Sequence, residues 1–122
     1  MKNIVKFSEI SKKDIKLVGG KGANLGELKK AKVSVPDGFC VTVQAYYDFI
    51  KKHGILDLIK SQLKDLDPEN TKKLNVVSRK IKKRVLAAKI DPKLQDEIKK
   101  AYSQLGAEYV AVRSSATAED LP

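Results

Sequence analysis

The sequence has few of the residues from which disulfides, zinc sites and histidine chemistry are built. Its 122 residues include one cysteine, Cys40, one histidine, His53, and no tryptophan. A lone cysteine excludes an internal disulfide and a multi-cysteine zinc site within one chain. Cys40 lies in an apolar run, FCVTV, where we expect the thiol to act as a small buried hydrophobe. The sequence therefore predicts a chain held together without disulfides or a multi-cysteine zinc site.

Long apolar runs are also absent. No run approaches the roughly 18 residues that a membrane-spanning helix needs. The first residues, MKNIVKFSEI, have neither the apolar block nor the small-residue cleavage site of a secretory signal. We therefore expect a cytoplasmic protein with no membrane partner.

Arginine is scarce despite the large positive charge. The formal net charge is +10, but only Arg79, Arg84 and Arg113 are arginines, and the other basic residues are lysines. Clustered cations attract nucleic acid, whereas base readout and stacking favour arginine and interleaved aromatic residues. The lysines are also spread over several faces of the expected helices. We interpret them as a solvated surface, and a non-catalytic basic binding module stays open as an alternative.

The pattern of apolar residues predicts a helix-rich α+β unit with a few short strands. The expected strands lie at residues 3–7, 39–41 and 109–112. Residues 8–22 are expected to form a polar connection. The expected helices run from near Gly22 to Ala31, from Gln44 to His53 with Thr42 as the cap, over residues 56–66, from after Pro68 to Ala88, and from Pro92 to Leu105.

Glycine is concentrated in one stretch, VGGKGANLGEL, at residues 18–28. Four of its eleven positions are glycine, and Lys21 lies among them. Bare backbone can turn its N–H groups toward a ligand, the following helix offers further unpaired N–H groups, and the lysine adds a positive charge. These features suit a phosphate bound by Lys21 together with the backbone of Gly19, Gly20 and Gly22.

Neither of two familiar glycine motifs fits this stretch. A P-loop needs a glycine five positions before Gly20, where Ile15 stands, and a Ser or Thr after Lys21, where Gly22 stands. The dinucleotide fingerprint needs one residue fewer between Gly22 and Gly26. Spacing alone therefore leaves a plain glycine turn before a helix open as an alternative to an anion site.

Arg113 is a second candidate for binding an anion. It directly follows the apolar run Tyr109 to Val112, which we expect to be a buried strand. A guanidinium at the carboxyl end of a strand can grip phosphate oxygens through two parallel hydrogen bonds. A structural ion pair with Glu119 or Asp120 is the alternative on the residues alone.

The neighbouring residues do not predict hydrolase chemistry. No G-x-S-x-G elbow surrounds Ser114 or Ser115. His53 stands at the expected end of a helix, where a histidine serves as a partner of the helix dipole.

Three stretches together resemble one enzyme family. VGGKGANLGEL at residues 18–28, VPDGFCVT at 35–42 and VAVRSSATAEDLP at 110–122 are similar, in order and wording, to the amino-terminal region of the phosphoenolpyruvate synthases, or pyruvate, water dikinases. Pyruvate phosphate dikinases and rifampicin phosphotransferases look like relatives that share these blocks. The resemblance covers about half of the chain and both of its ends.

The resemblance implies an ATP-grasp nucleotide-binding domain, of which residues 1–122 are expected to be a single amino-terminal part. It implies that Lys21 and Arg113 contact the ATP phosphates, so the glycines beside Lys21 and the lysine itself are expected to cradle a triphosphate. The family makes phosphoenolpyruvate, AMP and phosphate from ATP, pyruvate and water through a phosphohistidine on another domain. His53 does not match that motif, and the Mg²⁺ ligands are expected outside this chain.

The resemblance also implies partners that are not in this sequence. These are the second half of the ATP-grasp domain and the phosphohistidine domain, so we expect the chain to be inactive alone. An apolar patch left uncovered by those parts leaves self-association open. A rifampicin phosphotransferase or a pyruvate phosphate dikinase stays open as an alternative, because the acceptor residues of all three lie elsewhere.

Overall fold

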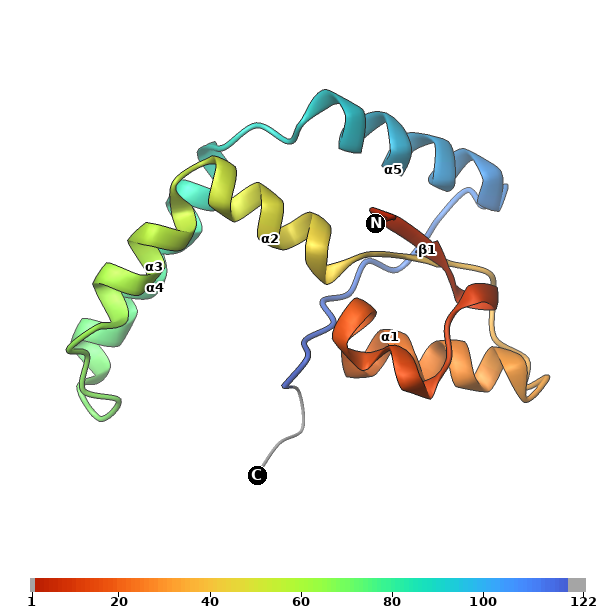
Figure 1. Ribbon diagram of the computed structural model, residues 1–122, viewed down its shortest axis with the longest axis horizontal. Coiled ribbons are helices and arrows are strands. Elements are labelled where there is room, and N and C mark those ends of the chain that lie inside the picture. The colour runs from red at the N-terminus through yellow and green to blue at the C-terminus, as the bar shows by residue number, and fades with distance from the viewer. Residues whose placement is uncertain (1, 119–122) are drawn as a thin grey trace. The chain divides into compact units, whose positions relative to one another are not determined.

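The computed structural model describes residues 2–118, which form mostly helices and one small sheet (Figure 1). The elements, in chain order, are β1 Ile4–Lys6, the 3-10 helices η1 Phe7–Glu9 and η2 Lys12–Asp14, α1 Ile15–Lys30, β2 Phe39–Val41, α2 Val43–Lys52, α3 Ile55–Leu63, α4 Thr71–Ala87 and α5 Pro92–Leu105. The predicted α+β class is confirmed. The five helices and the strands β1 and β2 lie where the sequence pattern predicts them, apart from the beginning of α1.

The chain divides into two compact units. One comprises Met1–Tyr46 and Pro92–Pro122, and the other comprises Tyr47–Asp91. The first unit holds every predicted site residue. These residues are Lys21, Arg113 and the glycines of the GGKG stretch, residues 19–22.

Strands β1 and β2 form an antiparallel pair in the first unit. Val5 lies opposite Cys40 in the register, and the N–H of Phe7 extends the ladder by donating to the carbonyl of Gly38 at 3.0 Å. Helix α5 packs against β1, and Asn3 Nδ2 donates to a carboxylate oxygen of Glu97 on that helix at 3.3 Å. The sheet therefore joins the two parts of the sequence that make up this unit.

The core of the first unit lies between this sheet and α1. Its fully buried side chains are Val5, Ile10, Val18 and Ala23, and Phe7, Leu17 and Cys40 pack against them. The cluster supports the helix that carries the GGKG stretch.

The prediction of a polar connection from residue 8 to residue 22 is wrong. Two 3-10 helices form there, and α1 begins at Ile15. A capping box begins η2. The N–H of Ser11 donates to Asp14 Oδ2 at 2.8 Å, and the N–H of Lys13 donates to Ser11 Oγ at 3.3 Å. This S-x-x-D pattern satisfies donors at the start of η2, and α1 follows η2 directly, so helical structure begins earlier than the apolar spacing suggests.

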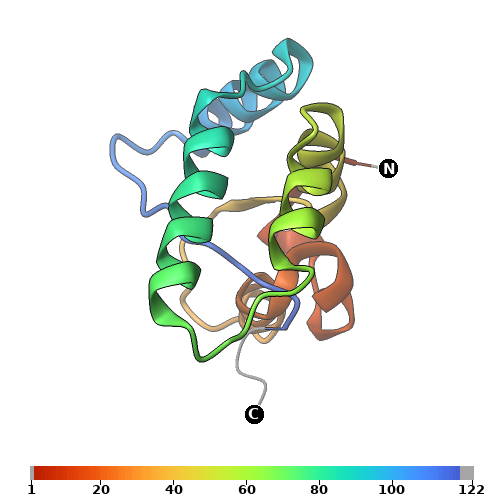
Figure 2. The same ribbon diagram turned by 90° about the vertical axis from the view of Figure 1, so that its left-hand side faces the viewer.

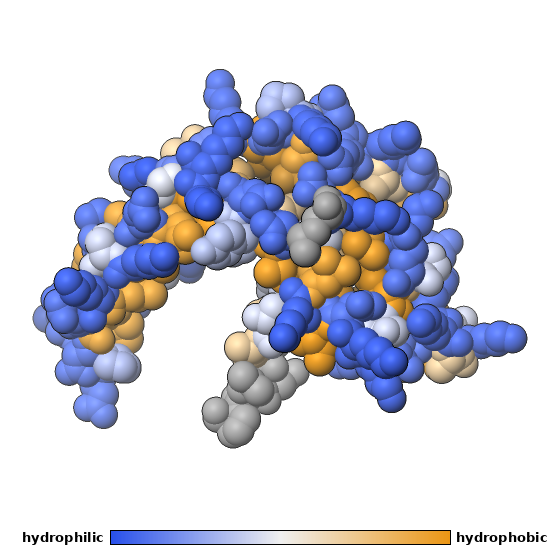
Figure 3. All heavy atoms as spheres, viewed as in Figure 1, coloured by the Kyte–Doolittle hydropathy of each residue, from blue (hydrophilic) through white to orange (hydrophobic). Residues whose placement is uncertain are grey.

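The predicted buried strand at residues 109–112 is also wrong. The segment is irregular, and Tyr109 and Val112 are 86% and 92% exposed. A strand needs a neighbouring strand for its backbone groups and a surface on which to bury its side chains. Within residues 2–118 the one sheet is the β1–β2 pair, which does not include this segment. Other apolar side chains are exposed among hydrophilic residues (Figure 3).

In the second unit, α3 and α4 lie side by side and run in opposite directions (Figure 2). Asn70 caps α4 by accepting a hydrogen bond from the N–H of Lys73, and Val77 of this helix is buried. Arg84 donates to the carbonyl of His53 at 3.1 Å. Among residues 2–118, no helix has the length and apolar character to cross a membrane.

Thr42 provides a test of this fold, because it is fully buried and holds two elements. Its hydroxyl accepts from the N–H of Ala45 at 3.2 Å, which confirms the predicted cap, and donates to the carbonyl of Lys2 at 3.1 Å. We expect Thr42→Val to lower the free energy of unfolding by about 1–3 kcal/mol, since the N–H of Ala45 and the carbonyl of Lys2 both lose their partner. Urea unfolding measures this. The control is Thr71→Val at an exposed position of α4, and equal stability of the two variants would contradict the assignment.

Candidate functional site

Helix α1 is broken at Gly19. This residue has φ 79° and ψ 171°, and it separates residues 15–18 from residues 20–30 of the helix. A break of this kind leaves carbonyl groups of the first segment and N–H groups of the second without their helical partners. The GGKG stretch is therefore not an open loop, because Gly20, Lys21 and Gly22 form the first turn of the second helical segment.

Residues 114–116 supply the missing hydrogen bonds at this break. Ser115 Oγ accepts a hydrogen bond from the N–H of Gly22 at 3.0 Å and donates one to the carbonyl of Val18 at 2.6 Å. The N–H of Gly20 donates to the carbonyl of Ala116 at 3.0 Å. One hydroxyl group thus bridges the two segments of α1. In Figure 1 the chain following α5 runs past the start of α1.

Gly19 is required by this contact. Its positive φ lies in a region that other residues rarely adopt, and its ψ makes the conformation one that glycine almost alone occupies. A Cβ built on Gly19 would lie 2.7 Å from the carbonyl carbon of Ser115 and 2.8 Å from its oxygen. Both the backbone conformation and the approach of Ser115 therefore depend on the missing side chain.

Lys21 reaches the same segment. Its Nζ donates to the carbonyl of Ser114 at 3.2 Å, and the residue is half-buried. Arg113 directly precedes Ser114 in the chain and is exposed. The two motifs that carry the predicted cations are therefore adjacent in space, although more than 90 residues separate them in the sequence.

The predicted backbone donors have partners within the chain. The N–H groups of Gly20 and Gly22 donate to Ala116 and Ser115 respectively, so an anion that uses them has to displace this segment. The alternative ion pair of Arg113 with Glu119 or Asp120 lies outside the described residues. Among residues 2–118, no three His, Cys, Asp or Glu side chains gather in a way that could hold a metal ion.

The sequence reasoning missed the role of Ser115. It considered this residue only as a nucleophile. In the structure its hydroxyl donates to the carbonyl of Val18, 97 residues earlier, at the break in α1. A local cap is visible as a short sequence spacing, but a cap supplied from so far along the chain has no such signal.

Cys40 packs behind the GGKG turn. A Cβ built on Gly22 would lie 3.0 Å from its Sγ, and burial raises the pKa of the thiol. Because the thiolate is the reactive form, a raised pKa makes the group inert at neutral pH. Its packing against the core confirms the expectation of a small hydrophobe.

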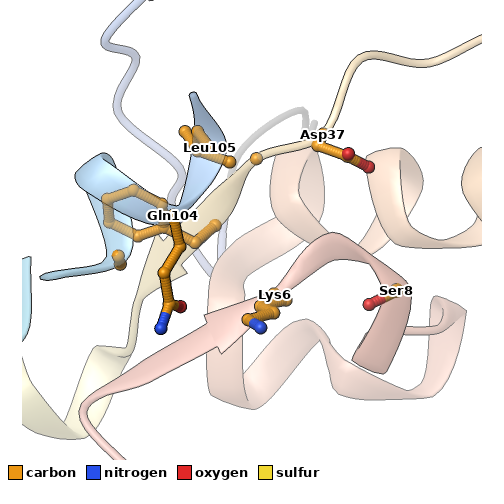
Figure 4. Close-up of a pocket in the computed structure, with 8 residues that line it drawn as sticks. Lys6, Ser8, Asp37, Gln104 and Leu105 are labelled. Atoms are coloured by element: carbon orange, nitrogen blue, oxygen red, sulfur yellow. The ribbon is translucent and has the colours of Figure 1, made fainter. Parts of the chain in front are cut away.

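A separate pocket of about 250 Å³ lies in the first unit (Figure 4). Phe39, Ala101 and Leu105 contribute apolar surface, and Lys6, Ser8, Asp37 and Gln104 contribute polar groups. Asp37 already accepts from Lys29 Nζ at 2.7 Å, and this hydrogen bond lowers the pKa of the Asp37 carboxyl. None of the predicted site residues lines this pocket, so it is distinct from the junction of the two motifs.

Comparison with known proteins shows the family to which the chain belongs. Residues 15–122 match the family described as the AMP/ATP-binding domain of pyruvate phosphate dikinase, and the chain belongs to this family. The matched region includes both Lys21 and Arg113.

Curated relatives of the chain include phosphoenolpyruvate synthases and a rifampicin phosphotransferase. The chain is 48% identical over 121 residues to a probable phosphoenolpyruvate synthase of Archaeoglobus fulgidus and 41% identical over 127 residues to the phosphoenolpyruvate synthase of Pseudomonas aeruginosa. It is 40% identical over 121 residues to a rifampicin phosphotransferase of Bacillus cereus. These alignments cover 95%, 98% and 98% of this chain but 16%, 16% and 14% of the relatives. The resemblance found in the sequence motifs is thereby confirmed.

We expect Gly19→Ala to destabilise the first unit by about 2 kcal/mol or more, because the new Cβ meets Ser115 and the backbone leaves its allowed region. The matched control is Gly20→Ala. A Cβ there has its nearest neighbour 3.8 Å away, the oxygen of Ala116, and alanine favours a helix. Urea unfolding of both variants measures the difference. Equal effects of the two substitutions would contradict the described break at Gly19.

The raised pKa of Cys40 predicts slow alkylation. At pH 8 the thiol of the folded chain should react with iodoacetamide more slowly than the same thiol in urea, because less of it is thiolate and it is half-buried.

The raised folded-state pKa of Cys40 also contributes stability that is present below the unfolded-state pKa, about 8.5, and is lost as pH rises through the folded-state pKa. Cys40→Ala should remove this pH dependence. Equal alkylation rates in folded and unfolded chains would contradict both expectations.

Proposed function

We propose that this chain is the ATP-phosphate-binding part of a phosphoenolpyruvate synthase. The observation that carries the proposal is the contact between the two motifs, with Lys21 Nζ donating to the Ser114 carbonyl beside Arg113. Membership of the AMP/ATP-binding domain family and the identity to phosphoenolpyruvate synthases support it. The chain spans 16% of the length of these relatives, and the activity proposed here belongs to a protein of their length.

The side chains suit a polyphosphate in complementary ways. Lys21 supplies a point charge on a flexible stem, and Arg113 supplies a planar fork that matches two phosphate oxygens. Because the N–H groups of Gly20 and Gly22 are hydrogen-bonded to residues 115–116, the proposal assigns the first contacts with a phosphate to the two cationic side chains rather than to these backbone groups. Backbone contacts at Gly19, Gly20 and Gly22, as the sequence predicts, would follow if residues 115–116 move aside.

The finer assignment is an ATP-grasp fold, in which nucleotide lies between two parts of the domain. In this proposal the described residues contribute one wall of the cleft, and the remaining wall, with the Mg²⁺ ligands, comes from outside this chain. Mg²⁺ supplies charge neutralisation at the phosphates when it is bound. Lys21 and Arg113 bind and orient the phosphates before any transfer, and the proposed setting is the cytoplasm.

In the proposed enzyme, ATP, pyruvate and water yield phosphoenolpyruvate, AMP and phosphate by way of a phosphohistidine on another domain. His53 takes no part in this transfer. Its ring packs against Phe49 with centroids 4.9 Å apart, and its carbonyl accepts from Arg84 in the second unit. The chain alone therefore binds but does not turn over nucleotide.

The second candidate is a rifampicin phosphotransferase, which the 40% identity to the Bacillus cereus protein favours. Both candidates share the ATP-binding step proposed here and differ in the acceptor, so they predict the same behaviour of Lys21 and Arg113. A non-catalytic, nucleic-acid-binding module would instead bind DNA or RNA with an affinity that falls steeply with salt. Filter binding across salt concentrations separates that alternative from the first two.

We expect Mg-ATP to bind the 122-residue chain weakly, with a dissociation constant on the order of millimolar, because one wall of the cleft supplies few contacts. NMR titration should shift the amide signals of residues 20–22 and 113–116. Lys21→Ala and Arg113→Ala should each weaken binding by roughly tenfold or more, which is the loss of one charge-assisted hydrogen bond.

Matched controls separate the site from general electrostatics. Lys30→Ala, on the last turn of α1, and Arg79→Ala, in the second unit, remove the same charges at exposed positions and should leave the titration unchanged. Shifts confined to other residues, or equal effects in all four variants, would contradict the assignment. So would an absence of shifts at ATP concentrations well above the expected dissociation constant.

A further inference from the structure

The hydroxyl of Ser115 lies at the point where the two motifs meet. It accepts from the N–H of Gly22 at 3.0 Å and donates to the carbonyl of Val18 at 2.6 Å, so it touches both sides of the break at Gly19. Ser115 is half-buried, and Val18 and Gly22 are buried. The hydrogen bonds are therefore shielded from competing water.

The two neighbours of Ser115 also contact α1. Ser114 accepts from Lys21 Nζ at 3.2 Å through its carbonyl, and Ala116 accepts from the N–H of Gly20 at 3.0 Å. These two contacts use backbone carbonyls of residues 114 and 116, whereas Ser115 uses its side chain. Neither carbonyl contact joins the first segment of α1 to the second, as the Ser115 hydroxyl does.

We infer that Ser115 is a positioning residue. Its hydroxyl bridges the two segments of α1, and this bridge holds Lys21 close to the carbonyl of Ser114, the residue that follows Arg113. This role rests on the proposed function, because it concerns the geometry of the same two cations. Consecutive Cα atoms are about 3.8 Å apart, so fixing Ser115 against Val18 and Gly22 also limits where Arg113 can lie.

The bonding of Ser115 argues against a nucleophilic role. Its proton is directed to the Val18 carbonyl, and one lone pair is directed to the Gly22 N–H. A nucleophilic serine needs a base to take that proton. A backbone carbonyl oxygen cannot act as that base, so the hydroxyl orients its neighbours rather than reacting.

The test compares Ser115→Ala with Ser115→Thr, which keeps a hydroxyl, and with Ser114→Ala as the matched control. Ser114 is exposed, and within residues 2–118 its contact with Lys21 uses the backbone carbonyl, which alanine keeps. Amide hydrogen exchange of Gly22 should become faster by on the order of tenfold in Ser115→Ala, since a shielded hydrogen bond is lost. It should stay near the wild-type rate in Ser115→Thr and Ser114→Ala.

A second readout separates positioning from general stability. At a temperature where circular dichroism shows Ser115→Ala still folded, the nuclear Overhauser effects between the Lys21 side chain and the backbone of residues 113–114 should be lost. Ser115→Thr should restore them. An unchanged Gly22 exchange rate, or retained Overhauser effects in Ser115→Ala, would overturn the assignment.

If Ser115→Ala does not fold, the wild-type chain still decides the question. The hydroxyl proton of Ser115 should be visible in water because it is held by Val18, and that of Ser114 should not. An invisible Ser115 hydroxyl proton would overturn the inference.

None of these measurements needs a nucleotide. A wild-type chain that shows them without binding Mg-ATP would therefore refute the proposed function and leave the role of Ser115 in place.

Discussion

The candidate site depends on the closing of a broken helix. At Gly19 the chain leaves the helical conformation. Backbone C=O groups of the first segment and N–H groups of the second therefore lack helical partners and need others. Ser115 and Ala116 provide them, and Lys21 adds a contact to Ser114. A continuous α1 would satisfy its own backbone groups and would offer residues 114–116 nothing to bind. The irregular backbone is therefore the reason that two motifs from opposite ends of the sequence meet.

This arrangement gives Gly19 and Gly22 a packing role. From the sequence alone, the glycines of residues 19–22 suggest backbone N–H groups that are kept free to bind an anion. In the structure Gly19 allows Ser115 to approach, and Gly22 lies against Cys40 at the edge of the core. The packing role and the proposed phosphate role are compatible, since both place a cation and a serine-containing segment at one helix start. The family match spans both partners of this contact.

The parts of the fold that could be predicted are those with local causes. The strands at residues 4–6 and 39–41, the Thr42 cap and the stop of α5 at Gly106 each follow from neighbouring residues. The Ser11–Asp14 capping box that begins η2, directly before α1, also has a local cause, because it is an S-x-x-D spacing in the sequence. Residues 109–112 could not be judged from their own composition, because a strand forms only where another strand offers its edge. The bridging role of Ser115 was hidden for the same reason, since its partners lie far along the chain.

The distance of Ser115 from its partners has a consequence for how the molecule forms. A hydroxyl that must find a carbonyl 97 residues earlier closes a long loop, and contacts of such high sequence separation carry a large entropic cost and form slowly. During synthesis, which starts at the amino terminus, α1 can pack on β1 and β2 long before Ser115 emerges from the ribosome. The nascent chain thus passes through a stage in which the helix start is open and Lys21 has no Ser114 carbonyl to bind. The contact between the two motifs is completed only after residues 114–116 have been translated.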